Sequence, residues 1–281
     1  MPELPEVEVV KNALEPILIN QCIERVTFHR PDLRFPLPPA LPGFLKGQVV
    51  DTILRRGKYI VVFARNGYGF VLHLGMSGVI RVEGPGTQKI HEKHDHVEFQ
   101  IRGGTRVVFN DARRFGFLEM LEKTSWETYP AFAAMGPEPL GNDFNGPVLM
   151  AALKGLRSPV KTALLNQKVV AGIGNIYACE ALYMAGLDPR RPAGSLNASE
   201  CEALVASIRH VLEAALESGG SSLRDYKHID GKPGYFQHHF AVYDHQGESC
   251  PRCKCDITKT GGIQRIVQAG RSTFLCETLQ G

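Results

Sequence analysis

The chain has 281 residues, of which 43% are hydrophobic and 22% charged, the composition of an ordinary globular protein. Its length favours two domains, and no apolar run of about eighteen residues is present, which excludes a membrane-spanning helix. The N-terminus MPELPEVEVV has three glutamates in its first eight residues, unlike a signal or transit peptide. Seven cysteines, an odd number, argue against a secreted disulfide-bonded protein. We therefore expect a cytoplasmic protein that has no membrane partner.

The net charge of +3 is concentrated at the C-terminal end of the chain. Residues 250–281 hold five basic and two acidic side chains, whereas the other 249 residues hold 27 of each sign. Four of the seven cysteines lie in the same tail. A small, basic, cysteine-rich module on a neutral body predicts a metal site and a polyanionic partner.

The N-terminal part of the sequence predicts mainly β-structure. The apolar spacing indicates a helix over 7–18, and a proline-rich loop or sheet edge follows over 30–43. Apolar residues then alternate in five runs that predict strands at 58–64, 70–76, 96–101, 105–111 and 114–121. Glycine-rich turns between the runs are typical of antiparallel hairpins in a sandwich or barrel.

Helices are predicted after a Pro/Gly-rich linker at 131–147. The helical runs lie within 148–156, 158–167, 175–186 and 199–220, and a polar stretch with Gly and Pro follows. We expect three parts around the linker: a β-domain at 1–130, a helical domain at 148–240 and a cysteine module at 241–281.

Cys250 and Cys253 form a CxxC pair whose spacing allows two thiolates to bind one tetrahedral zinc ion. Cys276 is placed to begin a second pair, but the position three residues later is Leu279. The fourth ligand would then be another group: Cys255, His245, Asp256 or a water. The alternative is a redox-active CxxC pair, or a degenerate ribbon that binds no metal.

Two short motifs in the C-terminal half could bind phosphate. The run 261–274 predicts two strands around a tip at 268–271, where the planar guanidinium of Arg271 could reach a phosphate. Glycines before Asn175 end one helix, and Asn175 is predicted to cap the next, as in a helix–turn–helix. The alternatives are a solvated surface arginine and a plain turn between two core helices.

Met76 in HLGMSG (73–78) and Phe115 in DARRFG (111–116) lie on glycine-flanked turns of the β-domain. Apolar side chains beside an arginine are used to wedge apart DNA base steps. The alternative is that both side chains fill the core. The nearby His91, His94 and His96 predict no metal site, because the carboxylate between the last two points to the other face of a strand.

Removal of Met1 would leave Pro2 with a free secondary amine, part of which is neutral at pH 7. Such an amine can attack a sugar C1′ and form an iminium, and the neighbouring Glu3 could donate or shuttle a proton. Taken alone, however, a proline at position 2 has no specific meaning.

Together these motifs resemble the formamidopyrimidine-DNA glycosylase family, bacterial repair enzymes for oxidised purines. The similar segments are PELPEVE (2–8), HLGMSG (73–78), KHDHV (93–97), DARRFG (111–116), GPEPLG (136–141), GIGNIYACEAL (172–182), DGKPGYF (230–236) and GRSTF (270–274). They are colinear over essentially the full length. PELPEVE is similar to the formamidopyrimidine branch rather than to the sister endonuclease VIII branch. The chain departs from the family at Leu279, where the zinc ribbon normally has its fourth cysteine.

The resemblance implies an α+β fold. Its N-terminal domain would be an antiparallel β-sandwich flanked by helices. Its C-terminal domain would be a helical helix–two-turn–helix domain with a terminal β-hairpin zinc finger, holding one Zn²⁺ per chain.

The resemblance also implies roles for individual residues. Pro2 is the Schiff-base nucleophile, Glu3 assists opening of the sugar, and Lys58 transfers a proton in β-elimination, while Arg271 grips phosphates and acts in δ-elimination. The implied DNA contacts are the gap-filling Met76, Arg113 and Phe115, and the backbone contacts His94, Arg114, Arg157 and Asn175. The loop 221–236 corresponds to the segment that closes over the flipped base.

The implied function is that of a bifunctional base excision repair enzyme. It would flip out and excise 8-oxoguanine and formamidopyrimidines from double-stranded DNA, and then cleave the abasic strand by β,δ-elimination. We expect a monomer in the bacterial cytoplasm, at the nucleoid. The alternatives are an endonuclease VIII-like enzyme that prefers oxidised pyrimidines, and a non-catalytic DNA-binding relative. The presence of Pro2, Glu3 and Lys58 argues against the second alternative.

Overall fold

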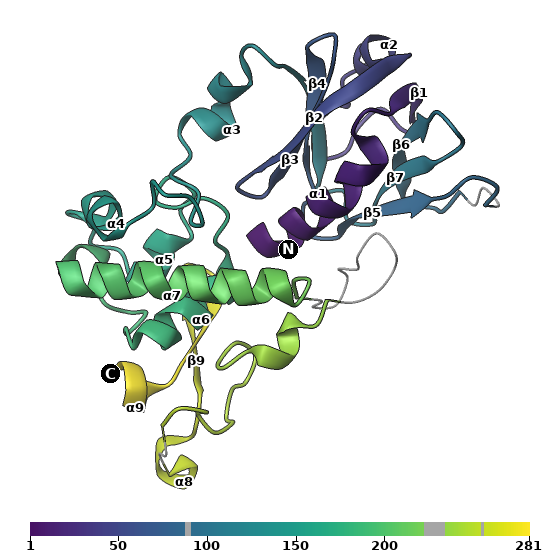
Figure 1. The fold of residues 1–281 in the computed structure, drawn as a ribbon. Coiled ribbons are helices and arrows are strands. Elements are labelled where there is room, and N and C mark those ends of the chain that lie inside the picture. Colours follow the sequence, from purple (N-terminus) through teal and green to yellow (C-terminus); the bar gives the residue numbers. More distant parts are fainter. Residues whose placement is uncertain (88–90, 222–233, 254–255) are drawn as a thin grey trace. The chain divides into compact units, whose positions relative to one another are not determined.

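The computed structural model describes residues 1–87, 91–221, 234–253 and 256–281, and the chain divides into two compact units (Figure 1). The first unit is Met1–Ala133 with Gly219–Tyr235, and the second is Ala134–Ser218 with Phe236–Gly281. The predicted α+β class is confirmed, because one unit is built on a sheet and the other mainly on helices. None of the described helices is long and apolar enough to cross a membrane.

The first unit is an antiparallel sheet whose strand order is β5-β7-β6-β1-β2-β3-β4-β8. Its strands are β1 (Cys22–Phe28), β2 (Gln48–Arg56), β3 (Tyr59–Ala64), β4 (Tyr68–His73), β5 (Gly78–Glu83), β6 (Asp95–Ile101), β7 (Arg106–Asp111) and β8 (Phe117–Glu122). Its helices are α1 (Leu4–Leu18), α2 (Leu41–Leu45) and α3 (Pro130–Ala133).

The sheet folds into two layers, as the sandwich prediction requires. Strands β1 and β2, at the middle of the order, pair through only two residue pairs. On either side of this junction lie four strands, and the ring of Phe70 on β4 stacks on that of Phe99 on β6 with centroids 4.9 Å apart. Buried apolar residues from both halves form one core. The two layers therefore share a single hydrophobic interior.

Helix α1 packs against β2 and β3, and it begins three residues earlier than the apolar spacing predicted. Glu3 and Glu6 form a capping box, and Pro5 lies in the first turn, where its missing N–H costs nothing. Leu4 and Val7 are buried on the inner face of the helix. This early start places Pro2 and Glu3 in the protein interior.

Three strands, β1, β2 and β5, were not predicted from the sequence. Charged residues interrupt the apolar alternation in β2 and β5, and their charges are paired in the fold. Arg55 on β2 bonds Glu8, and Arg81 on β5 bonds Glu83 and Asp95. These ion pairs allow strands to form where the hydropathy pattern is weak.

In the second unit, the long helix α7 packs against α4 and α6 (Figure 1). Its helices are α4 (Gly146–Leu153), α5 (Val160–Leu164), α6 (Asn175–Ala185), α7 (Ala198–Glu217), α8 (Ile257–Thr260) and α9 (Glu277–Gln280). Asn197 and Glu200 form the capping box that begins α7. The predicted hairpin is confirmed as β9 (Gln264–Gln268) and β10 (Arg271–Leu275), with Ala269 and Gly270 at its tip.

Candidate functional site

Pro2 and Glu3 are buried at the start of α1, and one carboxylate holds this end of the helix in place. Oε2 of Glu6 accepts a hydrogen bond of 2.8 Å from the backbone N–H of Glu3. Oε1 of Glu6 accepts from both the backbone N–H and the hydroxyl of Ser221, at 2.8 and 2.9 Å. Glu6 therefore ties the candidate nucleophile segment to Ser221, where the predicted loop 221–236 begins.

Most of that loop, residues 222–233, lies outside the described residues. Its two ends approach each other closely at their backbones. A Cβ atom added to Gly234 would lie 2.3 Å from the carbonyl oxygen of Gly220. Only glycine fits at Gly234, so the backbones of Gly220 and Gly234 lie in direct contact, with Gly220 beside Glu6.

Lys58 is buried at the turn between β2 and β3, directly after Gly57, which has a positive φ of 56°. The guanidinium of Arg55 donates a bond of 2.5 Å to Glu8 on α1, and another of 3.0 Å to the carbonyl of Gly57. Because Glu8 lies one turn into the helix that Glu3 caps, Arg55 fixes the turn of Lys58 against the helix of Pro2 and Glu3. The structure thus links the turn of Lys58 to the helix that begins after Pro2 and Glu3.

The buried carboxylate of Asp111 joins the two loops of the predicted wedge. It accepts hydrogen bonds from the hydroxyl of Ser77 at 2.5 Å, from the N–H of Arg113 at 3.3 Å and from the N–H of Gly116 at 2.8 Å. The hydroxyl of Ser77 also accepts from the N–H of Arg113 at 3.1 Å. A Cβ atom on Gly75 would lie 2.3 Å from the backbone nitrogen of Gly116. The two loops, 73–78 and 111–116, are therefore held together with their backbones in contact, and we call them the wedge.

Met76 and Phe115 project into solvent from these two loops, with 41% and 43% of their surface exposed. The guanidinium of Arg113 lies over the ring of Phe115, 4.8 Å from its centroid. The alternative that Met76 and Phe115 fill the core is therefore wrong. The structure brings the three predicted gap-filling residues together at one exposed edge.

His73, beside the wedge, is neutral at physiological pH. Burial, followed by the positive charges of Lys58 and Arg34, lowers the pKa of His73 to about 4. Its Nδ1 accepts a bond of 3.0 Å from the N–H of Gly75, so the ring proton is on Nε2. The ring also stacks on Phe117, with centroids 5.3 Å apart.

The remaining predicted backbone contacts are more scattered. His94 is half-buried just before β6, and Arg114 is exposed beside Arg113 with a positive φ of 57°. Arg157 is exposed in the connection between α4 and α5 of the second unit. These three placements leave the side chains accessible, and their role in DNA binding stays a prediction.

In the second unit, Arg271 is exposed at the start of β10, and its neighbour Ser272 anchors the strand. The carbonyl oxygen of Ser272 accepts hydrogen bonds from the ammonium of Lys161 at 2.8 Å and from the side-chain amide of Asn175 at 2.9 Å. Lys161 also donates to the hydroxyl of Thr273 at 2.8 Å. Residues in the first turns of α5 and α6 therefore hold the strand that carries Arg271.

The prediction that Asn175 caps α6 is wrong. The N-cap is Gly174, in an extended conformation, and Asn175 is the first residue of the helix. Its amide is engaged by Ser272 instead. Since an amide has two N–H donors, one bond to Ser272 is compatible with a second bond to a phosphate.

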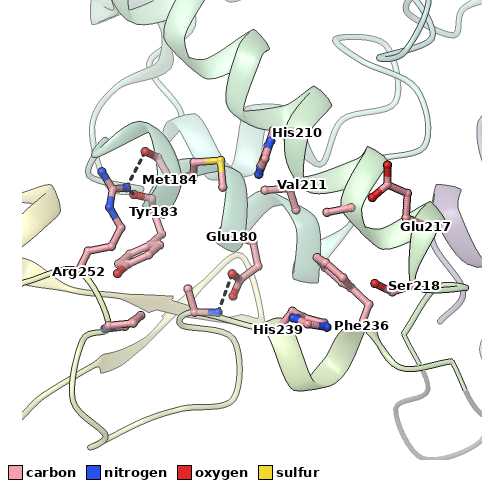
Figure 2. A pocket seen from close by; sticks show the side chains of 13 residues that line it. Glu180, Tyr183, Met184, His210, Val211, Glu217, Ser218, Phe236, His239 and Arg252 are labelled. Atoms are coloured by element: carbon pink, nitrogen blue, oxygen red, sulfur yellow. Dashed lines mark hydrogen bonds between the residues drawn. The ribbon is translucent and has the colours of Figure 1, made fainter.

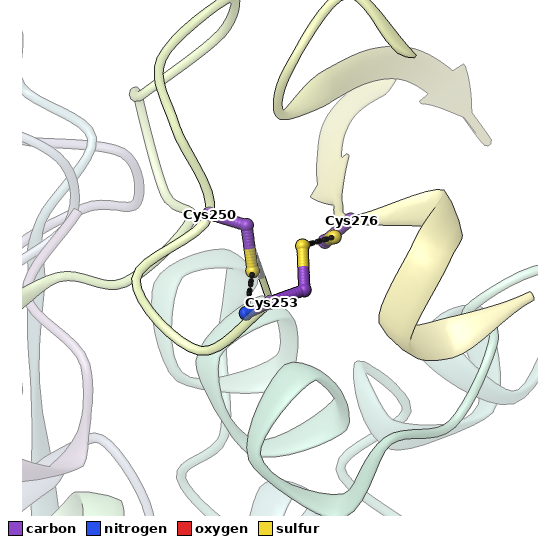
Figure 3. A group of neighbouring side chains, drawn as sticks. All are labelled: Cys250, Cys253 and Cys276. Carbon is purple, nitrogen blue, oxygen red and sulfur yellow. Dashed lines mark hydrogen bonds between the residues drawn. The ribbon is translucent and has the colours of Figure 1, made fainter. Parts of the chain in front are cut away.

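The thiols of Cys250, Cys253 and Cys276 converge, with their sulfur atoms all within 4.8 Å of one another (Figure 3). The sulfur atoms of Cys253 and Cys276 are 3.4 Å apart, and Cys250 Sγ accepts from the N–H of Cys253 at 3.3 Å. In a tetrahedral zinc site with Zn–S bonds near 2.3 Å, the sulfurs would be about 3.8 Å apart. The three thiols therefore fit three corners of a zinc tetrahedron.

Leu279 does not offer a fourth ligand and packs against the same cluster, together with Tyr183, Val242, Ile263 and Phe274. His245 bonds Glu248 and Asp256 caps α8, and among the described residues neither joins the thiol group. The structure thus does not place His245 or Asp256 with the three thiols. Cys255 lies outside the described residues.

A cavity of about 450 Å³ lies elsewhere in the second unit, between α6, α7 and the segment 236–252 (Figure 2). Its floor is Glu180, whose carboxylate accepts from the backbone N–H groups of Ala241, Val242 and Tyr243 at 2.8 to 3.0 Å. Burial raises the pKa of Glu180 in spite of these bonds. Glu180 thus anchors the segment before the cysteine module to α6, and we assign it a structural role.

Sequence reasoning missed the residues that position the site: Glu6, Arg55, Asp111 and Lys161. Glu6 and Asp111 lie inside motifs that were identified in the sequence, but a motif does not show which groups these carboxylates bond. Lys161 is fully buried, and because lysine is rarely buried, nothing in the sequence around it predicts that burial.

The comparisons with known proteins agree with this geometry. The formamidopyrimidine-DNA glycosylase N-terminal domain matches residues 1–118, and the formamidopyrimidine-DNA glycosylase H2TH domain matches residues 135–227. The formamidopyrimidine-DNA glycosylase of Rhodospirillum rubrum is 49% identical over 276 residues, covering 98% of each chain.

Solved structures show the same similarity. The crystal structure of the MutM (Fpg) protein of Thermus thermophilus has a TM-score of 0.86 and 37% identity, over 99% of this chain and 98% of that one. The Fpg of Lactococcus lactis in complex with DNA containing an abasic site has a TM-score of 0.89 and 32% identity, over 99% of both chains. The resemblance found in the motifs is confirmed: the chain belongs to the formamidopyrimidine-DNA glycosylase family of DNA repair enzymes.

Proposed function

We propose that the chain excises oxidised purines, namely 8-oxoguanine and formamidopyrimidines, from double-stranded DNA and then cleaves the resulting abasic strand. The observation that carries the proposal is the buried Pro2–Glu3 start of α1, held by Glu6 and fixed by Arg55 against the turn of Lys58. A non-catalytic DNA-binding protein would have no use for an N-terminus anchored in this way.

The proposed reaction begins at the amine that Pro2 presents once Met1 is removed. Its lone pair forms a bond to C1′ of the damaged nucleotide, and the bond from C1′ to the base breaks, with its electron pair leaving on the base. The proline nitrogen then gives up its proton, and the departing base takes up a proton. Glu3 assists opening of the sugar by protonating its ring oxygen as the bond from C1′ to that oxygen breaks, which gives an iminium between the proline nitrogen and C1′.

Strand cleavage then follows by two eliminations. Loss of a proton from C2′ expels the 3′ phosphate, and Lys58 is the group we assign to this β-elimination. A second elimination expels the 5′ phosphate, and we assign Arg271 to it. Lys161 and Asn175 both donate to the carbonyl of Ser272, the neighbour of Arg271. This anchoring of the strand supports the second assignment.

The base must leave the duplex before Pro2 can reach C1′, which costs a few kcal/mol of unstacking. We infer that Met76, Arg113 and Phe115 fill the gap and offset this cost. Their exposure on loops joined by Asp111 supports the assignment. His94, Arg114, Arg157 and Asn175 are proposed to bind the DNA backbone, and loop 221–236 to cover the flipped base.

We also propose that the module binds one Zn²⁺ per chain through Cys250, Cys253 and Cys276. When bound, the metal supplies a crosslink that stiffens the finger and has no part in the chemistry at C1′. The fourth ligand is a group other than Leu279. We expect the protein to act as a monomer in the bacterial cytoplasm, on DNA of the nucleoid.

Borohydride trapping on an 8-oxoguanine duplex tests the proposal, because reduction of the iminium leaves the enzyme covalently bound to DNA. The wild type is expected to form the adduct. Pro2→Gly, or a protein that retains Met1, is expected to bind the duplex and form none. Efficient trapping by Pro2→Gly would remove Pro2 from the mechanism. Trapping on an oxidised-pyrimidine duplex in preference to 8-oxoguanine would instead identify an endonuclease VIII-like specificity.

A further inference from the structure

The tip of the proline-rich loop near residue 35 exposes a large aromatic side chain that the proposed function does not use. Phe35 has 43% of its surface exposed, as much as Phe115 of the wedge. Its ring is covered on one side by the guanidinium of Arg34, which lies 5.5 Å from the centroid. An exposed phenylalanine beside an exposed arginine forms a surface that is apolar and cationic at once.

The loop holds this tip rigidly. The backbone N–H of Leu33 donates to the carbonyl of Phe35, and that of Leu37 donates to the carbonyl of Pro31, both at 2.9 Å. The side chains of Leu33 and Leu37 on either side of the tip are buried in the core. The hydrogen-bonded backbone therefore keeps the ring of Phe35 in solvent, although burial of the ring would stabilise the fold.

The tip is continuous with the wedge. The backbone N–H of Arg34 donates to the carbonyl of Gly116 at 3.3 Å, directly after Phe115. The ring of Phe35 meets Phe117 edge-on with centroids 5.4 Å apart, and Phe117 stacks on His73. The exposed surface of Phe35 and Arg34 therefore extends the edge that presents Met76 and Phe115.

The charge of this edge is positive. Within the described part of the chain, no carboxylate forms an ion pair with Arg34, and the one acid on the loop, Asp32, is bonded by Arg30. Hydrogen bonding to Arg30, together with the charges of Arg30 and Arg114, lowers the pKa of Asp32. The charge of Arg34 also acts on His73 alongside that of Lys58. Arg34 thus adds to the positive potential at His73, beside the wedge.

We propose that Arg34 and Phe35 form a further contact with duplex DNA, next to the nucleotides that the wedge separates. Arg34 binds a backbone phosphate through its guanidinium, and Phe35 packs against the sugar or base face of the adjoining nucleotide. The inference rests on the proposed function, since it assumes that DNA lies on the wedge. The contact stabilises the bound complex and takes no part in bond breaking.

Salt dependence of binding distinguishes this contact from a structural role. The affinity for a duplex with a tetrahydrofuran abasic analogue is measured by fluorescence anisotropy between about 50 and 200 mM salt. Arg34→Ala is expected to weaken binding about tenfold and to reduce the slope of log K against log salt by about 0.9, the loss of one phosphate contact. Phe35→Ala is expected to weaken binding with the slope unchanged. Single-turnover cleavage at saturating enzyme is measured alongside, because it reports the chemical step separately from affinity.

The chain supplies matched controls at the far end of the sheet. Phe44 is exposed to 39% and packs on Tyr68 at the start of β4, whereas His73 is at its end. Arg102 is highly exposed after β6, at the opposite end of that strand from His94. Phe44→Ala and Arg102→Ala are expected to bind as the wild type. Thermal melting, with Phe35→Leu as a milder variant, separates any loss of folding from a loss of contact.

The outcomes are distinct. An unchanged salt slope and affinity in Arg34→Ala overturns the phosphate contact, and equal losses in Phe35→Ala and Phe44→Ala overturn the packing contact. If the wild type itself neither binds the damaged duplex nor forms the borohydride adduct, the proposed function fails instead.

Discussion

The ammonium of Lys161 donates a hydrogen bond of 2.8 Å to the carbonyl oxygen of Ser272, 111 residues further along the chain. Lys161 is fully buried, and the oxygens of Ser272 and Thr273 take the place of water around its side-chain nitrogen. The bond joins helix α5 to the strand that begins at Arg271, and it makes the position of a candidate catalytic residue depend on a fully buried side chain.

Replacing Lys161 with Met is expected to lower the free energy of unfolding of the second unit by about 1–3 kcal/mol, because the hydroxyl of Thr273 loses its buried donor. Asn175→Ala should cost less, since Lys161 still satisfies Ser272. Urea denaturation measures both effects. Strand cleavage at a preformed abasic site should slow in Lys161→Met while Schiff-base trapping persists. Lys154→Met, at an exposed lysine, is the control, and equal behaviour of the two methionine variants would contradict the assigned role.

Asp111→Ala is expected to disorder the wedge. Three donors, from Ser77, Arg113 and Gly116, would lose their common acceptor, at a cost of about 2–3 kcal/mol. Asp111→Asn keeps one acceptor oxygen and should lose less. Thermal unfolding gives the stability, and 2-aminopurine fluorescence opposite an abasic analogue reports insertion of the wedge. A wild-type fluorescence response in Asp111→Ala would show that the loops do not need the carboxylate.

His73 predicts an acid-sensitive wedge. The pKa of its imidazole falls from 6.5 to about 4 on folding, so between these values the unfolded chain binds more protons than the folded one. The free energy of unfolding should therefore fall as pH decreases from 6.5 to 4, by at most about 3 kcal/mol, and should not depend on His73 above 6.5. Protonation at Nδ1 would also break its bond from Gly75.

Chemical denaturation at pH 7 and pH 4.5 measures this dependence. His73→Gln retains an acceptor for Gly75 and removes the titration, so its stability should change less between the two pH values. His238→Gln, at an exposed histidine of the second unit, should behave as the wild type. The prediction fails if His73→Gln and the wild type lose the same stability on acidification.

Leu279→Cys should strengthen metal binding. Four-ligand structural zinc sites contribute about 10–16 kcal/mol, so a site that gains a fourth thiolate should retain zinc against a chelator about 100-fold better. Metal analysis during titration with the chelator measures the difference, and Cys250→Ser should bind zinc more weakly than the wild type. Equal zinc retention by Leu279→Cys and the wild type would mean that another residue already completes the site.

The sequence motifs identified where the candidate site lies, but not the hydrogen bonds and ion pairs that position its residues. The strand before HLGMSG, the strands on both sides of DARRFG and the hairpin that carries Arg271 could be predicted, because glycines and apolar alternation mark them directly. Strands β2 and β5 could not, since the pairing of Arg55 with Glu8 and of Arg81 with Asp95 is visible only when distant segments meet.

The same limit explains the error at Asn175. A cap is a local prediction, whereas the amide of Asn175 bonds Ser272, which is 97 residues away. Glu6 and Lys161 were missed for this reason too. Their chemistry is ordinary, and their function comes from partners that no local pattern identifies.

The close approach of Gly75 to Gly116 also bears on how specificity could be redesigned. Because backbone meets backbone there, the spacing of the two loops does not depend on the three side chains that project from them. Met76, Arg113 and Phe115 can therefore be exchanged as a set without remodelling the scaffold. A library at these three positions, screened on duplexes that differ only in the base opposite the lesion, offers a direct route to enzymes with altered pairing preference.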